Sequence, residues 1–122
     1  MNPQLSDLKI KMLLCLLRLP AEKRFGTVMC EKFGLPKYEI SRAMSALEKD
    51  GLVDRTNIRN PVLTPDGEKL ATRYSRKFDL AKRHFIYEGV DPAIAERDAI
   101  VLALHCSDET FNVIKAMEER FL

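Results

Sequence analysis

A chain of 122 residues, 46% of them hydrophobic and 31% charged, has the composition of a folded domain rather than a disordered segment. Its longest apolar run, residues 12–17, is too short to cross a bilayer and no cleavable leader precedes it, so we expect no membrane partner and a cytoplasmic location. Three widely spaced cysteines (Cys15, Cys30 and Cys106) do not make a disulfide framework, which agrees with a reducing compartment.

The net charge of +2 is unevenly distributed along the chain. Residues 1–77 carry 15 Lys and Arg against 9 Asp and Glu, a balance of +6, whereas residues 78–122 carry 5 against 9, a balance of −4. A surface that binds a polyanion is therefore expected in the first part of the chain.

Three helices are predicted in the first part. Ser6-Asp7 can begin a helix that ends before Pro20, and a second, short helix ends at Phe33. The turn 34–36, Gly-Leu-Pro, separates it from a third helix over residues 37–50, which Gly51 ends.

The third helix has one apolar and one polar face. Ile40, Met44 and Leu47 follow each other at helical spacing and predict the buried side. The opposite face carries residues that can hydrogen-bond phosphates or base edges, and we predict that it contacts DNA: Lys37, Tyr38, Ser41, Arg42 and Ser45.

A hairpin follows, with β-like segments at 52–55 and 61–64 around a polar tip at 56–60. We predict that four of its residues contact phosphates or the minor groove: Arg55, Asn57, Arg59 and Asn60. An ordinary polar hairpin tip is the alternative. Lys23 and Arg24, before the second helix, are further candidates for phosphate contacts.

Three more helices are predicted in the second part. Thr64-Pro65-Asp66 begins a long helix of about 22 residues, roughly 33 Å, which ends at Gly89. Asp91-Pro92 begins the next helix, through Leu104, and Ser107 begins the last, with Phe111, Ile114, Met117 and Phe121 in one row. Apolar residues from Ile100 to Leu104 cover more than one helical face, so this part is expected to bury surface against a second copy of the chain.

These elements predict a mainly α fold: a winged helix-turn-helix domain (1–64) with a small two-stranded β wing, then a helical dimerisation region (65–122). The expected function is that of a transcriptional regulator binding double-stranded promoter or operator DNA as a homodimer. An enzyme is not expected, because the chain has two histidines, no glycine-rich phosphate loop and no third group to orient a Cys-His pair. The alternative is a winged-helix module that binds an acidic protein partner.

Two stretches carry a resemblance to a known family. "EISRAMSALEKDGLVDR" and "VLTPDGEKLATR", between Glu39 and Arg73, look like the recognition helix and wing of many bacterial and archaeal winged-helix regulators. The long helix, the "GVD" break and the helix ending before "SDE" resemble the iron- and manganese-dependent repressors of DtxR/MntR type. The resemblance implies a homodimeric repressor that binds promoter DNA when loaded with metal.

The resemblance also indicates where that family's metal ligands would stand in this chain. The matching positions are Phe78 on the long helix and Ile100, Ala103 and Leu104 on the next. None of these side chains can bind a metal, and the first helix lacks the expected carboxylates, so the family's metal site is expected to be absent.

A different metal site stays open as an alternative. His84, Glu88, His105 and Cys106 could together bind Zn, Mn or Fe at a place outside the family pattern. The simpler interpretation makes Cys106 a small buried residue and His105 a helix C-terminal residue favoured by the helix dipole. No cofactor is assigned from the sequence.

Overall fold

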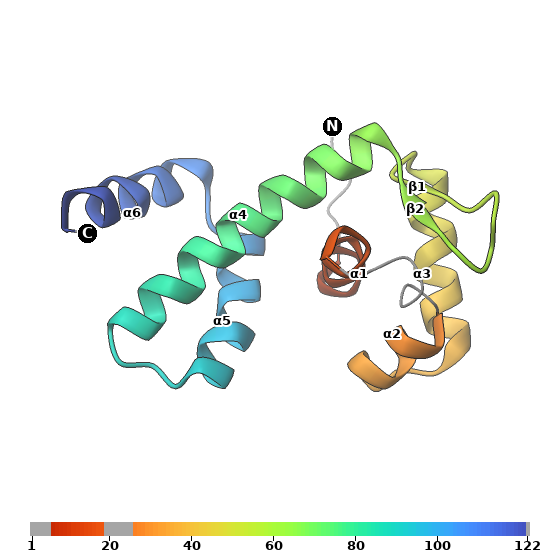
Figure 1. Ribbon diagram of the computed structural model, residues 1–122, viewed down its shortest axis with the longest axis horizontal. Helices are drawn as coiled ribbons and strands as arrows, with labels where there is room; N and C mark the ends of the chain where they lie inside the picture. Colours follow the sequence, from red (N-terminus) through yellow and green to blue (C-terminus); the bar gives the residue numbers. More distant parts are fainter. Residues whose placement is uncertain (1–5, 19–25, 122) are drawn as a thin grey trace. The chain divides into compact units, whose positions relative to one another are not determined.

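The computed structural model describes residues 6–18 and 26–121. Their elements are, in chain order, α1 (Asp7–Arg18), α2 (Gly26–Phe33), α3 (Lys37–Lys49), β1 (Val53–Asp54), β2 (Val62–Leu63), α4 (Pro65–Tyr87), α5 (Pro92–His105) and α6 (Asp108–Phe121) (Figure 1). The fold is mainly helical with one two-stranded sheet, as the sequence predicts. Within the described ranges, no helix is long and apolar enough to span a membrane.

The chain forms two compact units, Met1–Thr72 and Arg73–Leu122. Their boundary falls inside α4, so the first unit includes the opening turns of that helix. The first unit thus extends some way past the end of the hairpin.

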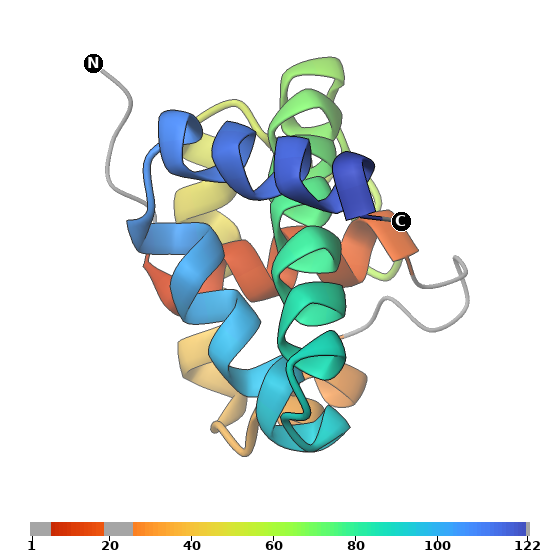
Figure 2. The ribbon, with the colours of Figure 1, turned by 90° about the vertical axis from the view of Figure 1, so that its left-hand side faces the viewer.

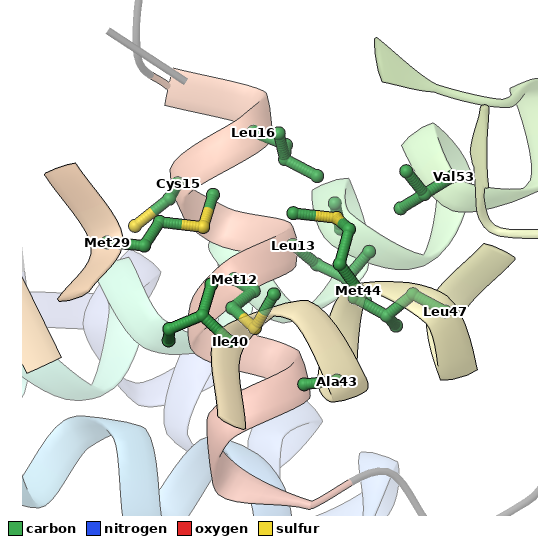
Figure 3. Packing of buried hydrophobic residues seen from close by; sticks show 11 residues of the cluster. Met12, Leu13, Cys15, Leu16, Met29, Ile40, Ala43, Met44, Leu47 and Val53 are labelled. Atoms are coloured by element: carbon green, nitrogen blue, oxygen red, sulfur yellow. The ribbon is translucent and has the colours of Figure 1, made fainter. Parts of the chain in front are cut away.

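The core of the first unit joins all its helices. Figure 3 shows side chains from α1, α2, α3 and β1 pointing toward one another. Met12 and Leu13 of α1, Met29 of α2 and Leu47 of α3 are fully buried there. Ile40 and Met44, the other two predicted core positions of α3, are buried with them, which confirms the apolar face of that helix.

A glycine follows each of the two helices of the helix-turn-helix, α2 and α3. Gly34 follows α2 with φ 65°, and the Leu35 N–H donates to the Cys30 carbonyl at 3.2 Å. Gly51 follows α3 with φ 77°, and the Leu52 N–H donates to the Leu47 carbonyl at 3.0 Å. Glycine adopts this left-handed backbone without steric cost, which is why the chain turns sharply at both places.

The wing, residues 53–63, is an antiparallel hairpin in which Val53 pairs with Leu63 and Asp54 with Val62. Its strands are shorter than the predicted segments, because the ladder stops at two residues on each side. Val53 is buried in the core, and Figure 1 shows the hairpin beside α3.

Thr64 joins the end of α3 to the beginning of α4. Its hydroxyl accepts a hydrogen bond from the Gly67 N–H at 3.0 Å, which is the N-cap bond expected from the sequence, and donates to the Gly51 carbonyl at 2.6 Å. The Thr64 N–H also donates to the Leu52 carbonyl at 3.1 Å. Thr64 therefore links the turn after α3, at residues 51–52, to the first turn of α4.

Replacing Thr64 with valine should lower the free energy of unfolding by about 1–2 kcal/mol, because the side chain keeps its shape but loses both hydroxyl bonds. Chemical denaturation of the two proteins measures the difference. Thr64→Ser, which keeps the hydroxyl, should stay close to the wild type; an equal loss in both variants would contradict the role of the hydroxyl.

The second unit is formed by the rest of α4 with α5 and α6, and Figure 2 shows it with α6 crossing in front of α4. The Asp91 carboxylate accepts from the Ala93 N–H at 3.1 Å and caps α5, next to Pro92. The Ser107 hydroxyl caps α6 by accepting from the Thr110 N–H at 3.2 Å. Both helix starts lie where the sequence predicts them.

Ion pairs from α4 reach α6. Arg73 and Lys77 contact the Asp108 carboxylate at 2.5 and 2.6 Å, and Arg83 contacts Glu118 at 3.0 Å. Two hydrogen bonds, the stronger effect coming from Arg73 and the weaker from Lys77, lower the pKa of Asp108 to about 2. The Asp108 carboxylate consequently stays charged, and keeps its ion pairs to α4, at acidic pH values at which an ordinary aspartate is already protonated.

Candidate nucleic-acid interface

The predicted DNA-contacting face of α3 is open to solvent. Five side chains share this exposed face, as the sequence predicts: Lys37, Tyr38, Ser41, Arg42 and Ser45. The Tyr38 side chain is 62% exposed, and the Arg42 guanidinium carbon lies 5.8 Å from the centre of its ring. This cation–π contact between consecutive turns restrains the Arg42 side chain on the outer surface of the helix.

Arg55 and Ser45, each predicted to contact DNA on its own, contact one another. Arg55 Nη1 donates to Ser45 Oγ at 2.8 Å and so joins the base of the wing to the last turns of α3. A guanidinium has five N–H donors, so Arg55 retains donors for a phosphate while it is held by Ser45. The bond sets the position of the wing relative to the helix.

The wing tip, residues 56–60, is shaped by polar bonds between near neighbours. Asp54 Oδ1 accepts from both the N–H and the hydroxyl of Thr56, at 2.8 and 2.6 Å, and these bonds lower the pKa of Asp54. Asn57 Oδ1 accepts from the Arg59 N–H at 3.1 Å, while the Asn57 carbonyl accepts from the Asn60 N–H at 3.0 Å. These bonds give the tip a defined shape without a longer ladder.

The four predicted wing residues differ in accessibility. Asn57 and Arg59 are exposed, whereas Arg55 and Asn60 are partly buried. The Asn60 side-chain oxygen is buried and has no hydrogen-bond partner within the described part of the chain, so it is the least accessible of the four predicted contacts. Lys23 and Arg24 lie outside the described residues.

The second unit does not assemble the alternative metal site. His84 and Glu88 lie at the end of α4, beside the beginning of α5, whereas His105 and Cys106 lie at the other end of α5. A helix of 14 residues is about 21 Å long, which separates the two pairs. Among the described residues, no group of three or more His, Cys, Asp or Glu side chains could hold a metal ion.

The positions matching the ligands of the resembled family are apolar and mostly buried. Phe78 is 5% exposed, Ile100 9% and Ala103 2%, and Leu104 is partly buried. Manganese and iron need nitrogen, oxygen or thiolate ligands, and these four side chains offer none. The residues present therefore do not fit the metal.

Cys15, the first of the three cysteines, is a buried core residue. Cys15 is 5% exposed in the core of the first unit, and desolvation raises the pKa of its thiol. A raised pKa lowers the fraction of reactive thiolate.

Comparison with known proteins finds proteins similar in sequence and structures similar in fold. No family model matches the chain. It is 27% identical to the transcriptional regulator MntR of Escherichia coli and 28% identical to that of Salmonella typhimurium, in each case over 92 residues. These residues are 75% of this chain but only 59% of the length of each relative.

Two solved structures share the fold. A crystal structure of IdeR from T. acidophilum matches with a TM-score of 0.72 and 17% identity, covering 99% of this chain and 55% of that one. A crystal structure of a hypothetical protein from Sulfolobus solfataricus matches with a TM-score of 0.68 and 14% identity, covering 95% and 91%. The chain is therefore similar in sequence to part of the transcriptional regulators named MntR, and it shares its fold with IdeR.

Proposed function

We propose that the protein is a transcriptional regulator that binds double-stranded promoter or operator DNA as a homodimer. The observation that carries the proposal is the exposed polar face of α3, with Arg42 restrained on it, beside a wing that presents Arg59. The transcriptional regulators named MntR support it, because 75% of this chain aligns with them.

In the proposed complex α3 enters the major groove. Arg42 is long enough to donate two hydrogen bonds to a guanine, and Tyr38, Ser41 and Lys37 reach base edges or flanking phosphates. The wing follows the backbone, where Arg59 and Asn57 at its tip contact phosphates. Arg55, held by Ser45, contacts a phosphate at the junction of the two elements.

The dimer is proposed to form through the second unit. Large apolar side chains are exposed there at helical spacing: Ile94 and Val101 on α5 are 43% and 49% exposed, and Val113 and Met117 on α6 are 61% and 52% exposed. Burying such residues against a second copy removes them from water. A two-fold dimer also presents two copies of α3 to the half-sites of a palindromic operator.

Regulation is proposed not to use the manganese or iron site of the resembled family. Phe78, Ile100 and Ala103 fill the matching positions with hydrocarbon, which stabilises the unit without an ion and avoids burying unpaired charge. DNA binding would then be constitutive, or controlled by a partner or a small molecule.

The test is fluorescence anisotropy of the purified protein on the DNA upstream of its own gene. If that fragment does not bind, duplexes selected for binding from a random pool take its place. Binding should be equally tight with chelator and with added Mn, Fe(II) or Zn. The logarithm of the binding constant should fall linearly with the logarithm of the salt concentration, by about 0.9 for each phosphate contacted.

The outcomes separate the proposals. DNA binding that requires one of the metals would show that the protein has a metal site which a single chain does not assemble. His84, His105 and Cys106 would then be the first residues to replace. The absence of DNA binding under all conditions would contradict the proposed function and favour the winged-helix module that binds an acidic protein.

A further inference from the structure

The most exposed large hydrophobic side chain in the described part of the chain lies at the wing tip. Ile58 is 74% exposed, more than Tyr87 at 72% or Val113 at 61%. It stands between Asn57 and Arg59, far from the ends of the two strands in the hairpin loop. Isoleucine gains almost nothing from folding in this position, since water surrounds its branched hydrocarbon in the folded and the unfolded chain alike.

The shape of the tip does not require an isoleucine. The hydrogen bonds that form the tip come from the side chains of Asp54 and Asn57 and from the backbone. None of the tip residues 56–60 has a left-handed backbone, so the loop does not need a particular side chain at this position. Ile58 is therefore available to contact a partner.

The surroundings of Ile58 indicate the chemistry of that partner. The tip and its base carry two arginines, Arg55 and Arg59, against one carboxylate, that of Asp54, which accepts both of its hydrogen bonds from Thr56. An apolar pocket on another protein would have to accept both cations along with the isoleucine. A groove in DNA accepts them readily, because phosphates lie on both rims while sugars and base edges line the walls.

Resting on the proposed function, we propose that Ile58 enters the minor groove of the operator and makes apolar contact with the sugars and base edges there. Arg59, its neighbour, is directed to the phosphates at the rim or to the negative potential of a narrow groove. Branched apolar side chains serve as minor-groove contacts and wedges in DNA-binding proteins, with basic residues beside them. The contact would add affinity that does not depend on counterion release, and it would favour operators whose groove admits the side chain.

The test uses the full chain and three wing variants in the anisotropy assay, on the fragment that the wild type binds. Ile58→Ala should bind about tenfold more weakly, because an apolar contact is lost, with an unchanged salt dependence. Ile58→Leu should stay within about twofold of the wild type, since it keeps the apolar volume. Val62→Ala is the matched control: Val62 is an apolar wing residue on β2, 37% exposed and outside the tip.

A second measurement identifies the groove. Netropsin, which occupies the minor groove of AT-rich DNA, should weaken the wild type on an AT-rich fragment more than it weakens Ile58→Ala. Equal thermal unfolding midpoints of all variants show that the differences arise in the complex and not in folding.

Two results would overturn the inference, and they are distinguishable from a failure of the proposed function. If Ile58→Ala binds as tightly as the wild type, the wing contacts phosphates only and the proposed regulator stands. If Ile58→Ala binds more weakly but netropsin affects it as much as the wild type, Ile58 does not enter the minor groove. If the wild type itself binds no DNA, the proposed function and this inference both fail.

Discussion

Replacing Gly67 with alanine should destabilise the first unit by on the order of 3 kcal/mol or more, a large share of the stability of a small unit. A Cβ atom at this position would lie 1.9 Å from the Leu52 carbonyl oxygen and 2.8 Å from its carbon. Both atoms are backbone, so no side-chain rotation relieves the overlap. The Leu52 oxygen also accepts from the Thr64 N–H, which ties it in place.

Helix propensity alone predicts the opposite sign. Alanine is favoured over glycine inside a helix by about 1 kcal/mol, and Gly67 lies in the first turn of α4. The steric overlap is the larger effect, so the unfolding midpoint should fall by roughly 10 °C or more. Scanning calorimetry measures this, with Glu68→Ala, an exposed neighbour, as the control that should change little. A stabilised Gly67→Ala protein would mean that α4 can shift away from Leu52.

Reversing the charge of Arg42 with Arg42→Glu should weaken operator binding by about 100-fold or more, because a contact worth 1–3 kcal/mol becomes a repulsion. Arg42 is exposed on α3, where its guanidinium lies over the Tyr38 ring and makes no contribution to the core. The fold and the oligomeric state should therefore stay as in the wild type. Anisotropy titration and analytical ultracentrifugation measure the two quantities.

Lys69→Glu is the matched control for the change in net charge. Lys69 is exposed on α4 and is not among the predicted contacts, so its reversal should affect binding only through the general attraction for DNA. Equal losses in the two variants, or an unchanged affinity for Arg42→Glu, would place the DNA on another surface.

The helices could be predicted from local chemistry. The sequences Thr64-Pro65-Asp66 and Asp91-Pro92 specify N-caps, and the structure confirms both with hydrogen bonds from Gly67 and Ala93. These interactions depend on residues two or three positions apart, so one sequence contains all the information they need.

Contacts between distant residues could not be predicted in the same way. Ser45 and Arg55 are ten residues apart, on different elements, and their hydrogen bond depends on the turn at Gly51 that brings the wing back toward α3. Met117 fits the same helical row as Phe111, but it is 52% exposed, whereas Phe111 is 5% exposed. Helical spacing predicts which residues share a face, whereas the neighbouring elements decide how far along that face burial extends.

The candidate metal residues illustrate the same limit. His84 and Glu88 are one turn apart, and His105 and Cys106 are adjacent, so each pair satisfies a local criterion. Whether the two pairs meet depends on how α5 continues from the end of α4, and in the structure the pairs lie at opposite ends of α5.

The hydroxyl of Thr64 has a mechanical consequence for the wing. It is bonded both to the last turn after α3 and to the first turn of α4, so neither helix end can loosen without the other. The hairpin between them is closed at its base by this bond, and a second bond, from Arg55 to Ser45, holds the residue after β1 against α3. A wing fastened at both points has a fixed reach. In the proposed complex with DNA, such a wing would favour duplexes whose groove fits its shape and disfavour those that require it to bend.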